Sequence, residues 1–118
     1  MPFVETSLFK NDIKKFENIA NIISQNLYKT FKTSKNKITI YNNIIEKKYF
    51  YHNSILRNKE KRIFIKIFGL KRNKNLKKKL ALEIINGIQK LLKIKNASNI
   101  AIYFFDKLQA DIFHGKNI

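Results

Sequence analysis

Apolar residues recur along the chain in a pattern that divides it into two similar halves. Phe3 to Phe9 form an extended run, and the residues after it place apolar side chains at the three-to-four spacing of one helix face. These apolar positions are Ile13, Phe16, Ile19, Ala20, Ile23 and Leu27. Asn11 and Asp12 stand where a helix N-cap is expected. After a polar break, Ile38 to Ile45 form a second extended run.

The second half repeats this order of elements. Ile63 to Gly69 is rich in β-branched and aromatic residues and is predicted to be a strand. Asn73 is the expected N-cap of a second amphipathic helix. Its apolar positions are Leu76, Leu80, Ala81, Ile84, Ile88, Leu91 and Leu92. Ser98 and Asn99 end this segment, and Ile100 to Phe105 form a further predicted strand.

Two βαβ units therefore account for the chain and predict an α+β fold. One domain is expected over residues 1–118, with a first βαβ unit at 1–45, a hairpin connection at 46–62 and a second unit with a C-terminal tail at 63–118. Parallel strands joined by a helix take a right-handed crossover. Both helices should thus cover the same face of one four-stranded mixed sheet, giving a duplicated two-layer sandwich.

The strand patterns also predict self-association. In Ile63 to Gly69 one face carries three isoleucines, while the other carries Phe64, Lys66 and Phe68. The last strand likewise has apolar residues on both faces, as is typical of strands that are covered on both sides. Two helices can cover only one face, and the other would be a large exposed apolar patch. We therefore expect a homo-oligomer.

Composition narrows the class of protein further. The formal net charge is +17, but only three of the 25 basic residues are arginine, the residue best suited to reading phosphates and bases. The excess of lysine, isoleucine and asparagine is typical of an AT-rich genome. The run Lys71 to Lys79 is therefore interpreted as the solvated start of a helix, and nucleic acid is disfavoured as a partner.

The sequence also disfavours disulfides, a metal site, a membrane span and secretion. The chain has no cysteine, which excludes disulfides and thiolate chemistry, and His52 and His114 lie far apart without acidic partners at ligand spacing. No metal site and no cofactor are expected. No apolar run is long enough to span a bilayer, and no secretory signal begins the chain, so we expect a cytoplasmic protein.

Three stretches resemble the tautomerase superfamily, which includes 4-oxalocrotonate tautomerase and macrophage migration inhibitory factor. They are Met1-Pro2-Phe3-Val4 leading into a strand, FIKIFGLKRNKNLKKKLALEII from Phe64, and IAIYFFDKLQADIFHGKNI from Ile100. The likeness covers nearly the whole chain and extends to a bacterial family of unknown function within that superfamily. It implies a homotrimer and an active site at a subunit interface built around the amino-terminal proline.

The resemblance implies a keto–enol isomerase acting on a small anionic α-keto acid. If Met1 is removed, Pro2 presents a secondary amine. An α-amino group titrates at about 7.7–8.0, and an apolar pocket with cations lowers that pKa. Pro2 would then be the general base. By correspondence with the family, Arg72, Lys35 and Tyr103 are the expected substrate-binding residues.

Several alternatives stay open. Lys32 could take the role of Lys35, since the correspondence of that loop is uncertain by a few residues. If Met1 is retained, the Pro2 nitrogen is an amide without basicity. The chain also carries Asn11 where the shorter enzymes place a basic residue. A non-catalytic scaffold of the same fold is the alternative function, and a basic nucleic-acid-associated protein is a less favoured one.

Overall fold

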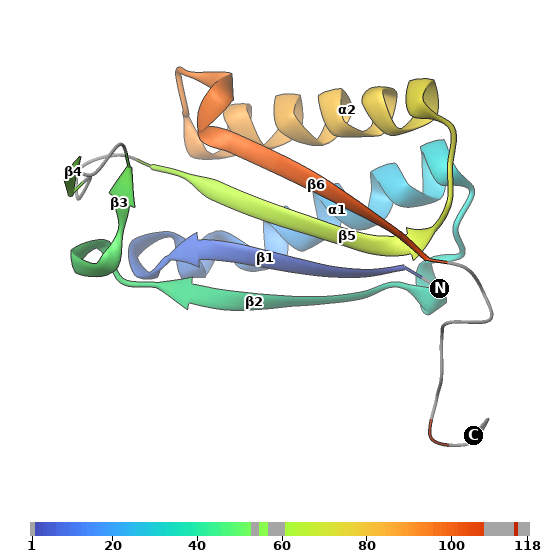
Figure 1. Ribbon diagram of the computed structural model, residues 1–118, viewed down its shortest axis with the longest axis horizontal. Coiled ribbons are helices and arrows are strands. Elements are labelled where there is room, and N and C mark those ends of the chain that lie inside the picture. Colours follow the sequence, from blue (N-terminus) through green and yellow to red (C-terminus); the bar gives the residue numbers. More distant parts are fainter. Residues whose placement is uncertain (1, 53–54, 57–60, 108–114, 116–118) are drawn as a thin grey trace.

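A four-stranded mixed sheet forms one layer of the protein (Figure 1). The computed structural model describes residues 2–52, 55–56, 61–107 and 115. The strands of the sheet are β1 (Phe3–Phe9), β2 (Thr39–Ile45), β5 (Ile63–Leu70) and β6 (Ile100–Lys107). They lie in the order β2-β1-β5-β6, with β1 parallel to β2, β5 parallel to β6, and β1 antiparallel to β5. This is the sheet that a duplicated βαβ unit predicts, and the α+β fold is confirmed.

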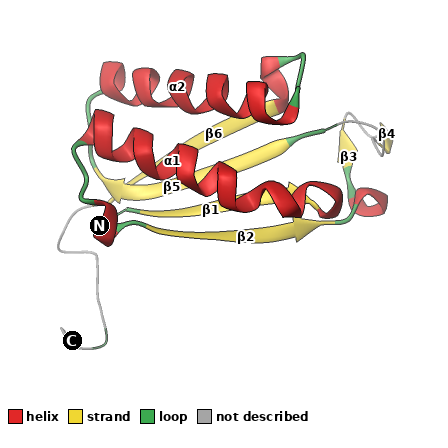
Figure 2. Cartoon of the chain, turned by 180° about the vertical axis from the view of Figure 1, so that it is seen from behind, coloured by secondary structure: helices red, strands yellow, loops and turns green. Residues whose placement is uncertain are grey.

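Two helices form the second layer, on one face of the sheet (Figure 2). They are α1 (Phe16–Phe31) and α2 (Lys74–Leu92). The side chain of Asn73 caps α2 as predicted, its Oδ1 accepting a hydrogen bond from the backbone N–H of Leu76 at 2.8 Å. Each helix ends at a lysine in the left-handed conformation, Lys32 after α1 and Lys93 after α2, which turns the chain back toward the sheet.

The predicted cap of the first helix is wrong. The chain leaves β1 directly into a short 3₁₀ helix, η1 (Lys10–Lys15), in which Asn11 and Asp12 lie, and no side chain caps it. α1 follows without an extended residue between the two, because Lys15 already has helical backbone angles. A side-chain cap needs an extended residue before the helix, and the continuous 3₁₀ turn removes it.

The core lies between the helices and the covered face of the sheet. Val4, Ile65 and Ile67 point from the strands toward Ile23 of α1 and Ile84 of α2, and all five are at most 2% exposed. The residues that the helical periodicity predicts to be buried form one side of this core, and those that the strand alternation predicts to be buried form the other. Burying each such side chain stabilises the fold by about 1.5–3 kcal/mol. The core fixes the ends of strands and helices that form the site.

The opposite face of the sheet carries a row of stacked aromatic rings. Tyr41, Phe3, Phe68 and Phe105 come from β2, β1, β5 and β6 in turn, and we call this row the aromatic ladder. Neighbouring ring centroids are 6.0, 4.5 and 4.7 Å apart, with interplanar angles of 14°, 6° and 14°. Three of the rings are 38–40% exposed in the single chain. The prediction that both sheet faces are substantially apolar is confirmed.

A small polar network crosses the same face. The Tyr41 hydroxyl donates a hydrogen bond of 2.8 Å to Glu5 Oε1, and Lys66 Nζ lies 3.6 Å from Glu5 Oε2. The hydrogen bond from Tyr41, aided by the charge of Lys66, lowers the pKa of the Glu5 carboxyl, and the same hydrogen bond raises the pKa of Tyr41. These polar groups specify the alignment of β2, β1 and β5 on a face that no helix covers.

Short elements complete the connections. Between β2 and β5 lie the 3₁₀ helix η3 (Lys47–Tyr49) and an antiparallel pair of short strands, β3 (Tyr51–His52) and β4 (Ile55–Leu56). The remaining 3₁₀ helices are η2 (Lys35–Lys37) and η4 (Ala97–Asn99). Apart from Gly115, the predicted C-terminal tail beyond residue 107 lies outside the described residues, as does His114. No helix among the described residues is long and apolar enough to cross a membrane.

Candidate functional site around Pro2

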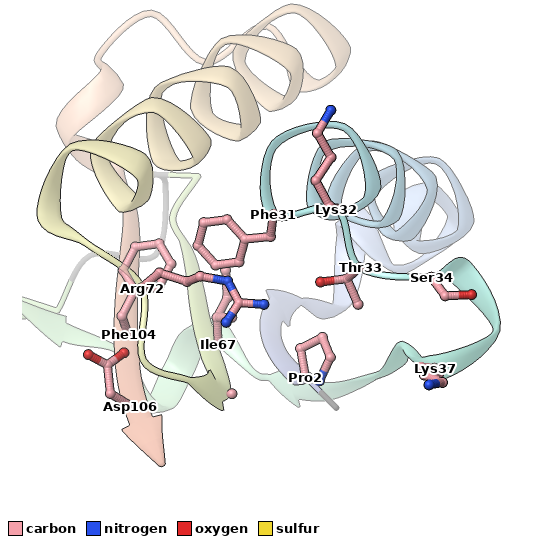
Figure 3. A pocket seen from close by; sticks show the side chains of 11 residues that line it. Pro2, Phe31, Lys32, Thr33, Ser34, Lys37, Ile67, Arg72, Phe104 and Asp106 are labelled. Carbon is pink, nitrogen blue, oxygen red and sulfur yellow. The ribbon is translucent and has the colours of Figure 1, made fainter. Parts of the chain in front are cut away.

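A pocket of about 270 Å³ opens at the end of the sheet where β1 begins and where β5 and β6 end (Figure 3). The end of α1 and the turn before α2 close its other sides. Its lining is Pro2, Phe31, Lys32, Thr33, Ser34, Lys37, Ile67, Gly69, Arg72, Phe104 and Asp106. Phe31, Ile67 and Phe104 give the pocket apolar walls, while Lys32, Lys37 and Arg72 contribute positive charge to its lining. Such a combination suits a small molecule that carries a negative charge.

Pro2 is held at the edge of this pocket by the backbone. Its carbonyl oxygen accepts a hydrogen bond from the N–H of Thr39 at 3.4 Å, which extends the pairing of β1 with β2 by one residue. Gly69 of β5 faces the proline ring, and a Cβ at that position would lie 3.4 Å from Pro2 Cβ. The ring is therefore half-buried between neighbouring strands, and its nitrogen is fixed by the start of β1.

Arg72 lies across the pocket from Pro2. It follows β5 and directly precedes the Asn73 cap, so the start of α2 fixes its backbone. The guanidinium carbon lies 5.2 Å from the centre of the Phe31 ring, and Nη1 donates to the Lys71 carbonyl at 3.4 Å. Figure 3 shows the guanidinium directed toward Pro2. Within the described part of the chain no carboxylate pairs with it, which leaves donors for a carboxylate ligand.

The remaining predicted site residues lie elsewhere in the single chain. Lys35 does not line the pocket, and its Nζ lies 5.4 Å from the ring centre of Tyr28. Tyr103 is 49% exposed, and its neighbour Phe104 lines the pocket, so Tyr103 points to the opposite face of the sheet. Lys32, the alternative to Lys35, does line the pocket, although Figure 3 shows its side chain directed away from Pro2.

Sequence reasoning missed several residues of the pocket. Thr33, Ser34 and Lys37 line it because the left-handed turn at Lys32 brings the following loop back beside Pro2. No periodic pattern marks such a turn, since left-handed lysine is uncommon. Phe31 was detectable only as the last apolar residue before that turn.

Asp106 brings an acidic group to the same pocket. Its Oδ2 lies 2.7 Å from Lys77 Nζ, and this lysine also lies 5.8 Å from the centre of the Phe104 ring. Asp106 follows Phe104 by two residues on β6, and strand alternation places both on the pocket side. Because Lys77 neutralises it, Asp106 does not cancel the charge of Arg72, and the pocket keeps a net positive character.

The described residues hold no cluster of three or more histidine, cysteine or acidic side chains that could bind a metal ion. The guanidinium can hold a carboxylate, and the Pro2 ring lines the same space. Pro2 and Arg72 are both site residues predicted from the sequence, and both line this pocket.

The fold is that of solved structures that include tautomerases and related enzymes, and the predicted fold resemblance is confirmed. Native fused 4-oxalocrotonate tautomerase superposes with a TM-score of 0.84 at 9% identity, covering 96% of this chain and 92% of that one. A member of the cis-3-chloroacrylic acid dehalogenase family gives 0.83 at 10% identity, covering 96% and 80%.

A malonate semialdehyde decarboxylase inhibited by 3-bromopropiolate gives a TM-score of 0.78 at 11% identity, covering 96% of this chain and 88% of that one. Neither a protein-family model nor a curated protein matches the sequence. At these identities the likeness establishes the fold, and the residues of the pocket must carry any argument about activity.

Proposed function

We propose that the protein is a tautomerase-like enzyme that interconverts the keto and enol forms of a small α-keto acid. The observation that carries this proposal is that Pro2 and Arg72 line one pocket from opposite sides. The fold supports it, because the structural neighbours include a tautomerase, a dehalogenase-family member and a decarboxylase.

In this proposal Met1 is removed and Pro2 carries a free secondary amine. Arg72 holds the substrate carboxylate through two parallel N–H donors, which orients the adjacent carbonyl. The Pro2 nitrogen takes a proton from the carbon next to the carbonyl, leaving an enolate whose negative charge the nearby cations stabilise. Return of that proton to the enolate oxygen completes the isomerisation. The proton is conserved, and no oxidant or reductant is needed.

The amine would be a poor base if the pocket were polar and open. Phe31, Ile67 and Phe104 supply apolar walls, and the ring is half-buried against Gly69. Burial beside a guanidinium disfavours a second positive charge and keeps an amine neutral. Lys37, from the loop after α1, adds a further positive group to the lining.

We test this reaction with protein whose loss of Met1 is verified by intact mass. Ketonisation of the enol of phenylpyruvate is followed by ultraviolet absorbance for the wild type, Pro2→Ala and a control, Lys71→Ala, which lies outside the pocket lining. Pro2→Ala replaces the rigid secondary amine with a more mobile primary amine that is still basic, so we expect it to lower kcat/KM by about tenfold or more, and Lys71→Ala to change it less than twofold. Equal activity of Pro2→Ala and wild type would contradict the proposal.

We further propose that the protein is a homotrimer in which the aromatic ladder is covered by neighbouring chains. The ladder is a contiguous apolar feature on a face that no helix covers, and a fused 4-oxalocrotonate tautomerase with 8% identity and a TM-score of 0.82 is a symmetric trimer. Light scattering should give three times the 14.0 kDa of one chain. Phe68→Glu should give the monomer mass, whereas Tyr28→Glu, at a 55% exposed position on α1, should not.

A further inference from the structure

A second hollow, of about 400 Å³, lies at the other end of the sheet from the Pro2 pocket. It is bounded by η1, which follows β1, by the start of η3, by the segment before β5 and by the end of α2. We call it the lysine hollow. Its lining is Asn11, Asp12, Lys14, Lys15, Lys47, Lys61, Leu91, Leu92 and Lys93. Seven strand residues separate the two sites along β1, which is about 20 Å.

The lining carries five lysines and one carboxylate, so the charge around this hollow is strongly positive. The lysines come from four separate segments, which makes the cluster a product of the fold rather than of one basic run. Like charges held around one cavity repel each other, and an anion in the middle relieves that repulsion.

Most of these lysines lack an acidic partner. The side-chain ammonium groups of Lys14, Lys15 and Lys93 form no hydrogen bond or ion pair with any other described residue. Lys61 Nζ donates to the Leu92 carbonyl at 3.3 Å at the end of α2, and Lys47 Nζ lies 5.7 Å from the Phe9 ring centre. The ammonium groups of the hollow are thus available to a ligand.

Asp12 is the exception to the positive lining. It is only 8% exposed, and its side chain has no hydrogen-bond or ion-pair partner in the described part of the chain. Because buried polar groups are normally hydrogen-bonded, this carboxylate needs a donor or a cation, which an anionic ligand does not supply, so Asp12 is not counted among the groups that would hold the ligand. Its negative charge repels an anion. Removing that charge should therefore strengthen anion binding, whereas removing a lysine charge should weaken it.

We propose that the lysine hollow binds a compact polyphosphate, a ligand with two or more linked phosphoryl groups. Five lysines can neutralise several phosphate charges at once, whereas a single carboxylate ligand would leave most of them unmatched. The volume lies within the 300–1,000 Å³ of ordinary small-molecule sites. Neither arginine nor an aromatic ring lines the hollow within the described residues, which disfavours base stacking and hence single-stranded nucleic acid.

Calorimetric titration with tripolyphosphate at fixed salt tests this site. Lys14→Gln and Lys93→Gln, changed on different elements, should each weaken binding about five- to tenfold by removing one close charge. Lys78→Gln is the matched control, because this exposed lysine of α2 lies outside the lining, and it should change the affinity less than twofold. Asp12→Asn should strengthen binding, since it removes the one opposing charge.

Titrations with two further ligands, adenosine triphosphate and inorganic phosphate, test which chemical class of anion the hollow binds. Adenosine triphosphate should bind about as tightly as tripolyphosphate if the hollow contacts only the phosphate chain, and inorganic phosphate should bind at least tenfold more weakly. The proposal is overturned if Lys78→Gln weakens binding as much as Lys14→Gln, if inorganic phosphate binds equally well, or if a single-stranded oligonucleotide displaces tripolyphosphate with higher affinity per molecule. Thermal melting identifies any variant that fails to fold, and the two exposed lysine variants keep the test valid if Asp12→Asn does not fold. Pro2→Ala should bind tripolyphosphate as tightly as the wild type does. A failure of the polyphosphate proposal can therefore be distinguished from a failure of the isomerase proposal.

Discussion

Replacement of Arg72 is the most informative single change in the Pro2 pocket. Its guanidinium stacks on Phe31 and is directed toward Pro2, and no described carboxylate neutralises it. Arg72→Ala therefore removes the donors for a substrate carboxylate without leaving a protein acid unpaired. The loss of the stacking contact should lower the stability of the free protein only by about 0.5–1 kcal/mol.

The kinetic cost follows from the lost charge-assisted hydrogen bonding. Such bonds contribute about 1.5–3 kcal/mol, which corresponds to a fall in kcat/KM of about 10- to 150-fold. Arg72→Lys keeps the charge but loses the planar pair of donors, so it should recover only part of the loss. Lys71→Ala is the matched control, since it removes a neighbouring cation outside the pocket lining.

The assay is the ketonisation of phenylpyruvate enol, with thermal melting of each variant alongside. The expected order of kcat/KM is wild type, then Arg72→Lys, then Arg72→Ala, with Lys71→Ala close to wild type. The reasoning is refuted if Arg72→Ala stays within twofold of wild type, or if Lys71→Ala lowers kcat/KM by as much as Arg72→Ala does.

Three further predictions concern the scaffold. Ile84→Ala, at a fully buried position of α2, should lower the free energy of unfolding by about 2–5 kcal/mol in urea titration, whereas Leu82→Ala, at a 51% exposed position on the same helix, should change it by less than about 0.5 kcal/mol. Asn73→Ala should cost about 1 kcal/mol by removing the cap of α2, and Asn73→Ser, which keeps an acceptor, should restore most of it; equal stabilities would contradict the cap assignment. A hydrogen bond from Lys29, with a second from Thr30, lowers the pKa of Glu83 in the folded chain, so its contribution to stability is present above the unfolded pKa and is lost as the pH falls through the folded value. Wild type should therefore lose more stability than Glu83→Gln as the pH is lowered from 6 to about 3, and parallel pH profiles would show that this pair does not couple the two helices.

Most of the fold could be predicted from the sequence because two periodicities alternate along the chain. The two-residue alternation of Ile63, Ile65 and Ile67 fixed which face of β5 is buried, and the helical spacing around Ile23 and Ile84 fixed what covers it. The cap of α1 could not be predicted in this way, because whether a 3₁₀ turn or an extended residue precedes a helix depends on how the chain leaves β1.

The candidate site was predictable in part. The proximity of Pro2 and Arg72 rests on family resemblance, since no periodic pattern relates the start of the chain to the residue before α2. The strand alternation already placed Tyr103 and Phe104 on opposite faces, and the pocket lies on the face of Phe104. The roles of Tyr103 and Lys35 stay predictions for the assembled protein. The position of the loop residues that follow Lys32 could not be predicted from the sequence, because it depends on one left-handed turn.

The central claim is that the mature chain presents a basic nitrogen at Pro2. The direct measurement is the mass of the amino-terminal peptide of the protein isolated from the cells that make it. The account predicts a peptide that starts at Pro2 with an unmodified secondary amine. A peptide in which Met1 remains bonded to Pro2 would contradict it, because an amide nitrogen cannot accept the substrate proton.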